Sequence, residues 1–345
     1  MALLRHSSPH RRLLIVGAWL SLVCIPATAG SQDPPAPPPA AVPPAAPGRA
    51  AAAGDVSEGL ALQVALDRAG FSPGVIDGQA GARTRQALQR FQEAHGLAAT
   101  GRPDDATRQA LGTEPPLVAY RLTDADIDGP YVARIPEDMM EKRTLDALAY
   151  TSPAEMLAER FHTSPRLLAR LNRGMTWTNG QTVRVPNVEP FIVPARTEAR
   201  KADPPASGQV ADVRVSRSGG TLLVRGTDGR VLLSAPVTSG SEHDPLPIGQ
   251  WKVTAVYLRP VFNYNPALFW DADPSHAQAK LPAGPNNPVG VVWIDLDKEH
   301  YGLHGTPEPS TVGVAQSHGC VRLTNWDALR LASLVRAGTP VLFEP

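Results

Sequence analysis

The spacing of apolar residues changes near residue 208, and this change most constrains how the chain can fold. Before it, over 57–112 and again over 144–188, apolar side chains recur at helical spacing. Beyond it, they gather in short runs separated by glycine and proline turns, which is typical of hairpins in a sheet sandwich. A chain of 345 residues with two such patterns is expected to be a multidomain α+β protein.

Residues 1–29 have the pattern of a secretory signal peptide. Three arginines precede an apolar run over 13–25, and small residues follow up to Ala29. We therefore expect an exported protein of the periplasm or cell envelope, with the signal cleaved after Ala29. An uncleaved segment would act as a tether, and lipid attachment at Cys24 is disfavoured because the bulky Val23 precedes it.

A Pro/Ala-rich segment over 30–56 is predicted to be a linker. Its composition favours extended polyproline II structure over a packed core. Across the chain, Lys plus Arg and Asp plus Glu balance at 33 each. The net charge therefore indicates no nucleic-acid partner.

Residues 57–113 are predicted to form a small domain of three short helices. Apolar residues recur at helical spacing in three segments, and a glycine-rich turn around Asp77 separates the first two. The run IDGQAGARTRQALQRFQEAHGL, followed by TGRPDDATRQAL, resembles the peptidoglycan-binding domain type 1. The resemblance implies a module that holds cell-wall polymer, and residues 114–143 are interpreted as a connector after it.

Residues 144–190 show two helical patterns followed by one strand-like run. The runs SPAEMLAERFHTSPRLLARLN and GQTVRVPN resemble a LysM domain, a family that binds the glycan of peptidoglycan or chitin. No clear first strand accompanies them, so the alternative is a structural bridge to the next domain. A polar linker over 191–207 follows.

The C-terminal region 208–345 holds the only thiol left once the signal peptide is removed. Cys320 stands in SHGCVR, sixteen residues after His304 in GLHGT. A thiol with a pKa of about 8.5 is mostly protonated at neutral pH, so a nearby imidazole must take its proton. The amides of Gly319 and Cys320 suit a developing oxyanion. The pattern indicates acyl transfer, with His304 or His318 as the base.

Metal binding is the competing use of these residues. A zinc site would need Cys320, His304 and His318 together, whereas thiolate-rich zinc sites contain more sulfur. Neither a metal nor an organic cofactor is therefore expected. The other histidines are expected at the surface, and the tryptophans of this region in the core or in cleft walls: His95, His162, His243, His276 and His300; Trp251, Trp270 and Trp293.

The run LHGTPEPSTVGVAQSHGCVRL resembles the signature of L,D-transpeptidase catalytic domains of the YkuD type. Upstream runs such as PLPIGQWKV and LPAGPNNPVGVVWI resemble the same family, so the likeness covers about 208–345. It implies a mainly-β sandwich with Cys320 as nucleophile and His304 as general base. It also implies that the amides of Gly319 and Cys320 hold the oxyanion.

Three further residues of this signature are grouped on the substrate side: Ser317, His318 and Arg322. Ser317 and His318 are also expected to orient the loop and to tune the imidazole or the thiol. Arg322 stands where many members carry asparagine. It is expected either to bind a substrate carboxylate or to pair with a structural acid.

The resemblance implies that Cys320 releases the terminal D-alanine of a tetrapeptide stem and forms a thioester. The acyl group then passes to an amine of another stem, to a lipoprotein lysine, or to water. The partners are therefore peptidoglycan stem peptides and glycan, and the sequence predicts no particular oligomeric state. The alternatives are a wall-binding scaffold with a vestigial catalytic domain and a metal-dependent hydrolase.

Overall fold

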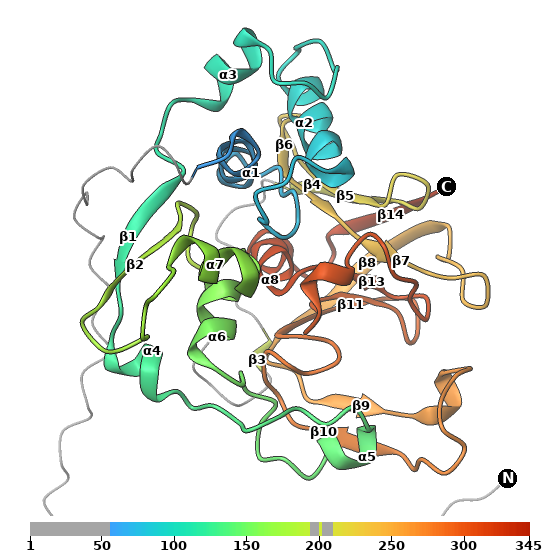
Figure 1. The fold of residues 1–345 in the computed structure, drawn as a ribbon. Coiled ribbons are helices and arrows are strands. Elements are labelled where there is room, and N and C mark those ends of the chain that lie inside the picture. The colour runs from blue at the N-terminus through green and yellow to red at the C-terminus, as the bar shows by residue number, and fades with distance from the viewer. Residues whose placement is uncertain (1–55, 194–199, 202–209) are drawn as a thin grey trace, which may run out of the picture. The chain divides into compact units, whose positions relative to one another are not determined.

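The computed structural model describes residues 56–193, 200–201 and 210–345 (Figure 1). The predicted signal peptide, the linker up to residue 55 and most of the linker predicted over 191–207 lie outside these residues. No helix within the described ranges combines the length and the apolar character needed to cross a bilayer. The described chain mixes helices and strands, which confirms the predicted α+β class.

Three helices form the N-terminal region, as predicted: α1 (Glu58–Arg68), α2 (Ala82–Ala94) and α3 (Asp105–Leu111). Side chains cap two of them, because Ser57 accepts the amide of Leu60 and Asp104 accepts the amide of Thr107. Such caps satisfy amides that have no partner within a helix. They therefore fix where α1 and α3 begin.

A two-stranded antiparallel sheet belongs to the middle segment. Strand β1 (Leu117–Arg121) pairs with β2 (Thr182–Pro186). The first strand thus lies within the segment interpreted as a connector, 114–143. The intervening helices are α4 (Asp124–Asp128), α5 (Met139–Lys142), α6 (Pro153–Arg160) and α7 (Pro165–Leu171). The LysM-like assignment and the domain boundaries remain predictions.

The C-terminal region consists mainly of strands, together with α8 (Asn325–Leu334) and the 3-10 turns η2 (Pro266–Leu268) and η3 (Pro309–Thr311). In chain order the strands are β3 (Arg200–Lys201), β4 (Val210–Ser216), β5 (Thr221–Gly226), β6 (Val231–Pro236), β7 (Thr238–Ser239), β8 (Gly249–Leu258), β9 (Phe262–Tyr264), β10 (Ala279–Leu281), β11 (Val292–Leu296), β12 (Gly302–His304), β13 (Val321–Arg322) and β14 (Pro340–Glu344). The predicted mainly-β catalytic region is therefore confirmed.

The long strand β8 joins the two halves of the main sheet. Its first half pairs with β14 and its second half with β11, so the strand order is β6-β5-β4-β14-β8-β11-β12-β13-β7. Strand β3, within the predicted 191–207 linker, also pairs with β8. Apolar residues of both halves and of α8 share one core. The pair β9–β10 forms a separate small sheet.

The N-terminal helices share their apolar cores with the rest of the molecule. Leu60 and Val64 of α1 pack in the core of the middle segment. Phe71, after α1, meets Phe91 of α2 edge to face with ring centroids 5.4 Å apart, and Val231 of β6 packs beside them. Figure 1 shows α2 next to β6. Burial of these side chains therefore depends on contacts between the predicted domains.

A buried polar junction joins all three predicted domains. The Asp67 carboxylate of α1 accepts from Nδ1 of His162, which follows α6, at 3.0 Å and from Arg330 of α8 at 3.3 Å. Asp67 is fully buried and His162 is 2% exposed. The prediction of a surface His162 is therefore wrong. This side chain is buried because Asp67 satisfies its ring nitrogen and Trp326 stacks on its ring.

Candidate active site

Strands β12 and β13 bring the predicted catalytic residues to one place. They are parallel neighbours, with Leu303 opposite Val321 and His304 opposite Arg322. Leu303 and Val321 are fully buried in the core. Because side chains alternate along a strand, His304 and Arg322 lie on the opposite face of the sheet. Cys320 directly precedes β13.

The thiol of Cys320 lies against the turn that leads into β12. It is partly exposed and donates to the carbonyl oxygen of His300 at 3.5 Å. Loss of contact with water raises the pKa of Cys320 to about 11, although the Gly302 amide and the Arg322 cation favour the thiolate. The resting nucleophile is therefore a protonated thiol, which needs a base.

The imidazole of His304 is neutral and has a defined orientation. Its Nδ1 donates to the Gly305 carbonyl oxygen at 2.7 Å, which leaves the lone pair on Nε2. The ring of Trp293 stacks on the imidazole with centroids 5.5 Å apart. Burial, and then the charge of Arg322, lower the pKa of His304 to about 3. His304 is therefore a proton acceptor throughout the neutral range.

Arg322 contributes positive charge to both groups. Its guanidinium donates to the Gln316 carbonyl oxygen at 3.4 Å, and no carboxylate of the described residues lies within ion-pair distance. Burial lowers the pKa of Arg322, and the acids Glu308 and Asp271 act on it only over a longer distance. The predicted structural acid therefore has no counterpart in the described chain, and the cation is available to a ligand.

The alkylation rate of Cys320 by iodoacetamide is expected to rise about tenfold per pH unit between about pH 6 and 9, because only the thiolate reacts. The pKa of about 11 leaves the thiolate a minor species over this range. Intact-mass spectrometry over time measures the rate, with N-acetylcysteine as the reference and Cys320→Ala as the blank. A plateau at neutral pH would instead indicate a preformed thiolate and imidazolium pair.

The backbone before Cys320 requires glycine. Gly319 has φ +94°, and a Cβ there would lie 2.8 Å from Cε1 of Tyr301. Both constraints exclude other residues, because L side chains rarely adopt such a φ and the ring leaves no room. Tyr301 thus packs directly against the loop that carries the nucleophile. The oxyanion role of the Gly319 amide remains a prediction.

Ser317 holds the loop rather than reaching a substrate. Its hydroxyl donates to the Cys320 carbonyl oxygen at 2.7 Å and accepts the Gly240 amide at 2.6 Å. With 3% exposure it has no surface to offer a ligand. The substrate-side placement of Ser317 is therefore corrected, because its hydroxyl is already used on both sides. The expected orienting role agrees with these bonds.

His318 is attached to the segment around η2. Its Nε2 lies 2.7 Å from Oδ1 of Asp271, and its ring packs against Phe269 and Trp270. This bond leaves the lone pair of the neutral ring on Nδ1, for which the described residues provide no hydrogen-bond partner. Each histidine therefore keeps one ring nitrogen free, and His304 as the base remains a prediction. No group of three or more His, Cys, Asp or Glu residues in the described chain is arranged to hold a metal ion.

Comparisons with known families match two of the regions that the sequence patterns indicate. Residues 211–342 match the model of the L,D-transpeptidase catalytic domain, YkuD, and residues 57–111 match the model of the peptidoglycan binding domain. The chain carries an L,D-transpeptidase catalytic domain after a peptidoglycan-binding domain. A Bacillus licheniformis protein provisionally named L,D-transpeptidase YkuD is 29% identical over 195 residues, which is 55% of this chain and 93% of that protein.

Further relatives match over shorter stretches. A Bacillus subtilis protein with the same provisional name is 49% identical over 57 residues, or 16% of this chain and 35% of that protein. Among solved structures, an L,D-transpeptidase from Mycobacterium smegmatis matches with a TM-score of 0.32 and 21% identity, over 40% of this chain and 59% of that chain. This chain therefore spans about a third of the B. subtilis relative.

In the L,D-transpeptidase domain, Asn325 and Glu159 support the backbone next to His304, and the sequence motifs single out neither residue. Asn325, at the start of α8, accepts the Val291 amide at 3.1 Å and donates to Glu159 of α6 at 2.6 Å. A Cβ on Gly305 would lie 2.1 Å from the Asn325 side-chain oxygen. Asn325 thus fixes the residue whose carbonyl orients His304, and α6 fixes Asn325.

Replacing Glu159 with glutamine is expected to stabilise the protein above about pH 7. Burial raises the pKa of Glu159 to about 7, although hydrogen bonds from Tyr150 and Asn325 act to lower it. The wild type should lose about 3 kcal/mol as pH rises from about 4.5 to 7, because the folded state binds the proton more tightly than the unfolded state does. The variant lacks this loss. Urea unfolding at pH 5 and 8 measures it.

The exposed Glu242→Gln variant carries the same charge change and should retain the wild-type pH dependence. Asp327, whose pKa burial raises to about 6, also contributes to the wild-type loss and remains in the variant. A Glu159→Gln variant whose stability fell as much as that of the wild type between these pH values would show that another group causes the loss. Tyr301, Asn325 and Asp271 are the site residues that sequence reasoning missed. A tyrosine next to GLHGT is a usable signal for the first, whereas the other two depend on contacts over long separations.

Proposed function

We propose that this chain is an L,D-transpeptidase that removes the terminal D-alanine of a peptidoglycan tetrapeptide stem through a thioester on Cys320. The acyl group then passes to an amine, which completes a crosslink between stems or attaches a protein to the wall. The enzyme acts outside the cytoplasm, because the predicted signal peptide would direct its export. The family of its catalytic domain and the peptidoglycan-binding domain before it support this function.

The acylation step uses the neutral pair Cys320 and His304. As Sγ attacks the carbonyl carbon of the third stem residue, the thiol proton passes to Nε2 of His304. The tetrahedral intermediate then breaks its C–N bond, and His304 returns the proton to the leaving D-alanine nitrogen. In deacylation, the acceptor amine attacks the thioester carbon and gives a proton to His304. The C–S bond then breaks, and His304 returns the proton to Sγ, which restores the thiol.

One observation carries the proposal: Cys320 directly precedes β13, which pairs with the strand β12 that ends at His304, and Nε2 of His304 keeps its lone pair free. Nδ1 is held by Gly305, and His318 is held by Asp271. Only proton transfer during attack can then produce the thiolate, because the pKa of Cys320 is about 11 and that of His304 about 3. The cation of Arg322 favours the thiolate and is available to a stem carboxylate.

The test is mass spectrometry of the purified chain incubated with a disaccharide-tetrapeptide, with and without EDTA. We expect loss of one D-alanine per stem, an acyl adduct that peptide mapping places on Cys320, and stem dimers, all unaffected by EDTA. Addition of a diamino acid amine should divert the acyl group from dimers to that amine. An unchanged substrate would overturn the proposal in favour of a scaffold, and inhibition by EDTA would favour a metal-dependent hydrolase.

A further inference from the structure

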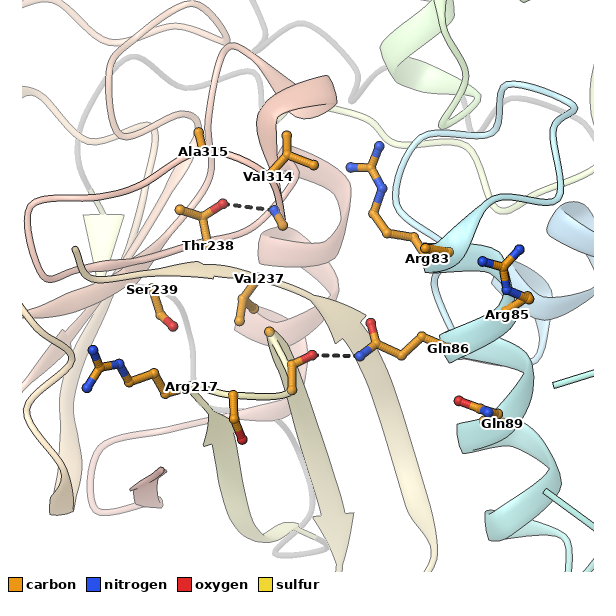
Figure 2. A pocket seen from close by; sticks show the side chains of 15 residues that line it. Arg83, Arg85, Gln86, Gln89, Arg217, Val237, Thr238, Ser239, Val314 and Ala315 are labelled. Carbon is orange, nitrogen blue, oxygen red and sulfur yellow. Dashed lines mark hydrogen bonds between the residues drawn. The ribbon is translucent and has the colours of Figure 1, made fainter. Parts of the chain in front are cut away.

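A separate cavity of about 550 Å³ lies between α2 and the catalytic sheet (Figure 2). Its walls contain three arginines: Arg83 and Arg85 of α2, and Arg217 from the turn between β4 and β5. Figure 2 shows Arg217 on the opposite side of the cavity from Arg83 and Arg85. Cys320 does not line the cavity, and neither does any acidic side chain.

The two walls of this arginine cavity are bonded to each other. Gln86 of α2 donates to the Gly219 carbonyl oxygen at 2.6 Å, and Arg83 donates to the Val312 carbonyl oxygen. Within the wall opposite α2, Thr238 of β7 accepts the Gly313 amide at 2.8 Å. The shape of the cavity is therefore present before any ligand arrives, which lowers the entropy cost of binding.

Two of the arginines have no counter-charge. Arg85 and Arg217 are exposed, and no acid of the described residues lies within ion-pair distance of either. Positive charges on both sides of a concave site concentrate anions there. A guanidinium also matches a carboxylate through two parallel hydrogen bonds. The cavity therefore fits a ligand with at least two separate carboxylates.

The rest of the lining favours a short peptide over other anions. Small exposed apolar side chains at Val314 and Ala315 suit methyl groups, and Gln89 with Ser239 offers hydrogen bonds to amides. A phosphate polymer would leave these apolar surfaces in contact with charge. Among the polymers of a cell wall, the stem peptide combines alanine methyl groups, amides and free carboxylates.

The cavity is also next to the strand that follows the nucleophile. Its lining includes Thr238 and Ser239 of β7, and β7 pairs with β13, so that Thr238 lies opposite Arg322. A peptide in the cavity thus lies beside the sheet edge that carries the catalytic loop. The peptidoglycan-binding domain and the catalytic domain would then hold parts of the same wall segment.

We propose that this arginine cavity binds a carboxylate-bearing stem peptide of the wall, separate from the stem that reacts at Cys320. This inference rests on the proposed function in one respect only, because that function identifies the stem that reacts at Cys320. Arg85 and Arg217 supply the charge that recognises the carboxylates, and Arg83 fixes the wall. The site therefore belongs to neither domain alone.

The experiment measures binding of a fluorescein-labelled stem tripeptide by anisotropy in the Cys320→Ala full chain, so that binding is separated from turnover. A second probe has each carboxylate converted to a carboxamide. We expect Arg85→Gln with Arg217→Gln to weaken binding of the first probe by about fivefold or more, and to abolish its preference over the amidated probe. The matched pair Arg102→Gln with Arg336→Gln, also exposed, should change neither result.

The outcomes separate this proposal from the proposed function. Lysine at positions 85 and 217 keeps the charge, so binding should fall less than with glutamine, and this excludes misfolding as the cause. An unchanged preference for the free carboxylates in the glutamine variant would overturn the proposal. So would stronger displacement by a glycerol phosphate oligomer than by unlabelled tripeptide. Release of D-alanine by chains with an intact Cys320 tests the catalytic function independently.

Discussion

Replacing Cys320 with alanine is expected to lower D-alanine release by more than about 10⁴-fold, because the methyl group can form no thioester. Wall binding should persist, because Cys320 belongs neither to the peptidoglycan-binding region nor to the lining of the arginine cavity. Two measurements check this: D-alanine released from a disaccharide-tetrapeptide, and co-sedimentation with purified wall. Loss of D-alanine release with retained wall binding would indicate an enzyme. A scaffold would keep its whole effect on the wall after this replacement.

Two further variants locate the cause of that loss. His304→Gln keeps the thiol but removes the proton acceptor, so we expect a loss of about 10²-fold to 10⁴-fold. His318→Gln should reduce activity less, because the proposed mechanism passes the thiol proton to His304, whereas Nε2 of His318 is bonded to Asp271. D-alanine release that survived in Cys320→Ala would assign the reaction to another nucleophile. A larger loss in His318→Gln than in His304→Gln would reverse the assignment of the base.

The sequence carries much of this site because its signature is local. The motif around Cys320 and the GLHGT run predict which side chains belong to the reaction, and the short apolar runs predict a sheet. The orientation of His304 and His318 is different, because the free nitrogen of each ring depends on the partner that its other nitrogen finds. Those partners, Gly305 and Asp271, are one residue and 47 residues away in the chain, and only folding brings Asp271 close.

Contacts over long separations explain the remaining differences between sequence and structure. Strand β1 has a partner 61 or more residues away, so its segment reads as a connector until β2 lies beside it. His162 stands among polar residues and yet is buried, because Asp67, 95 residues earlier, provides its hydrogen bond. Ser317 resembles a substrate residue in its motif, but the Gly240 amide already occupies its hydroxyl. None of these partners leaves a signal in the local sequence.

Replacing Asp67 with asparagine is expected to destabilise the chain by about 3 kcal/mol or more, because removal of one member of a buried charged group leaves the others without compensation. Arg330 would lose its partner, and His162 its acceptor geometry. Burial alone would raise the pKa of Asp67, but His162 and Arg330 outweigh it and hold that pKa below its usual value. Urea unfolding at pH 7 measures the change.

The pH dependence identifies the charge as the cause. A carboxyl group with a lowered folded pKa stabilises the protein above its unfolded pKa of about 4, and this contribution is lost as pH falls below it. The gap between wild type and Asp67→Asn should therefore narrow on acidification, whereas exposed Asp105→Asn should stay within about 0.5 kcal/mol of the wild type throughout. Because Asp67 connects α1 to α8, the wild type should unfold in one transition. Two transitions in the wild type would mean that the three predicted domains fold separately and that Asp67 does not couple them. A gap independent of pH would mean that the charge of Asp67 does not cause the loss of stability.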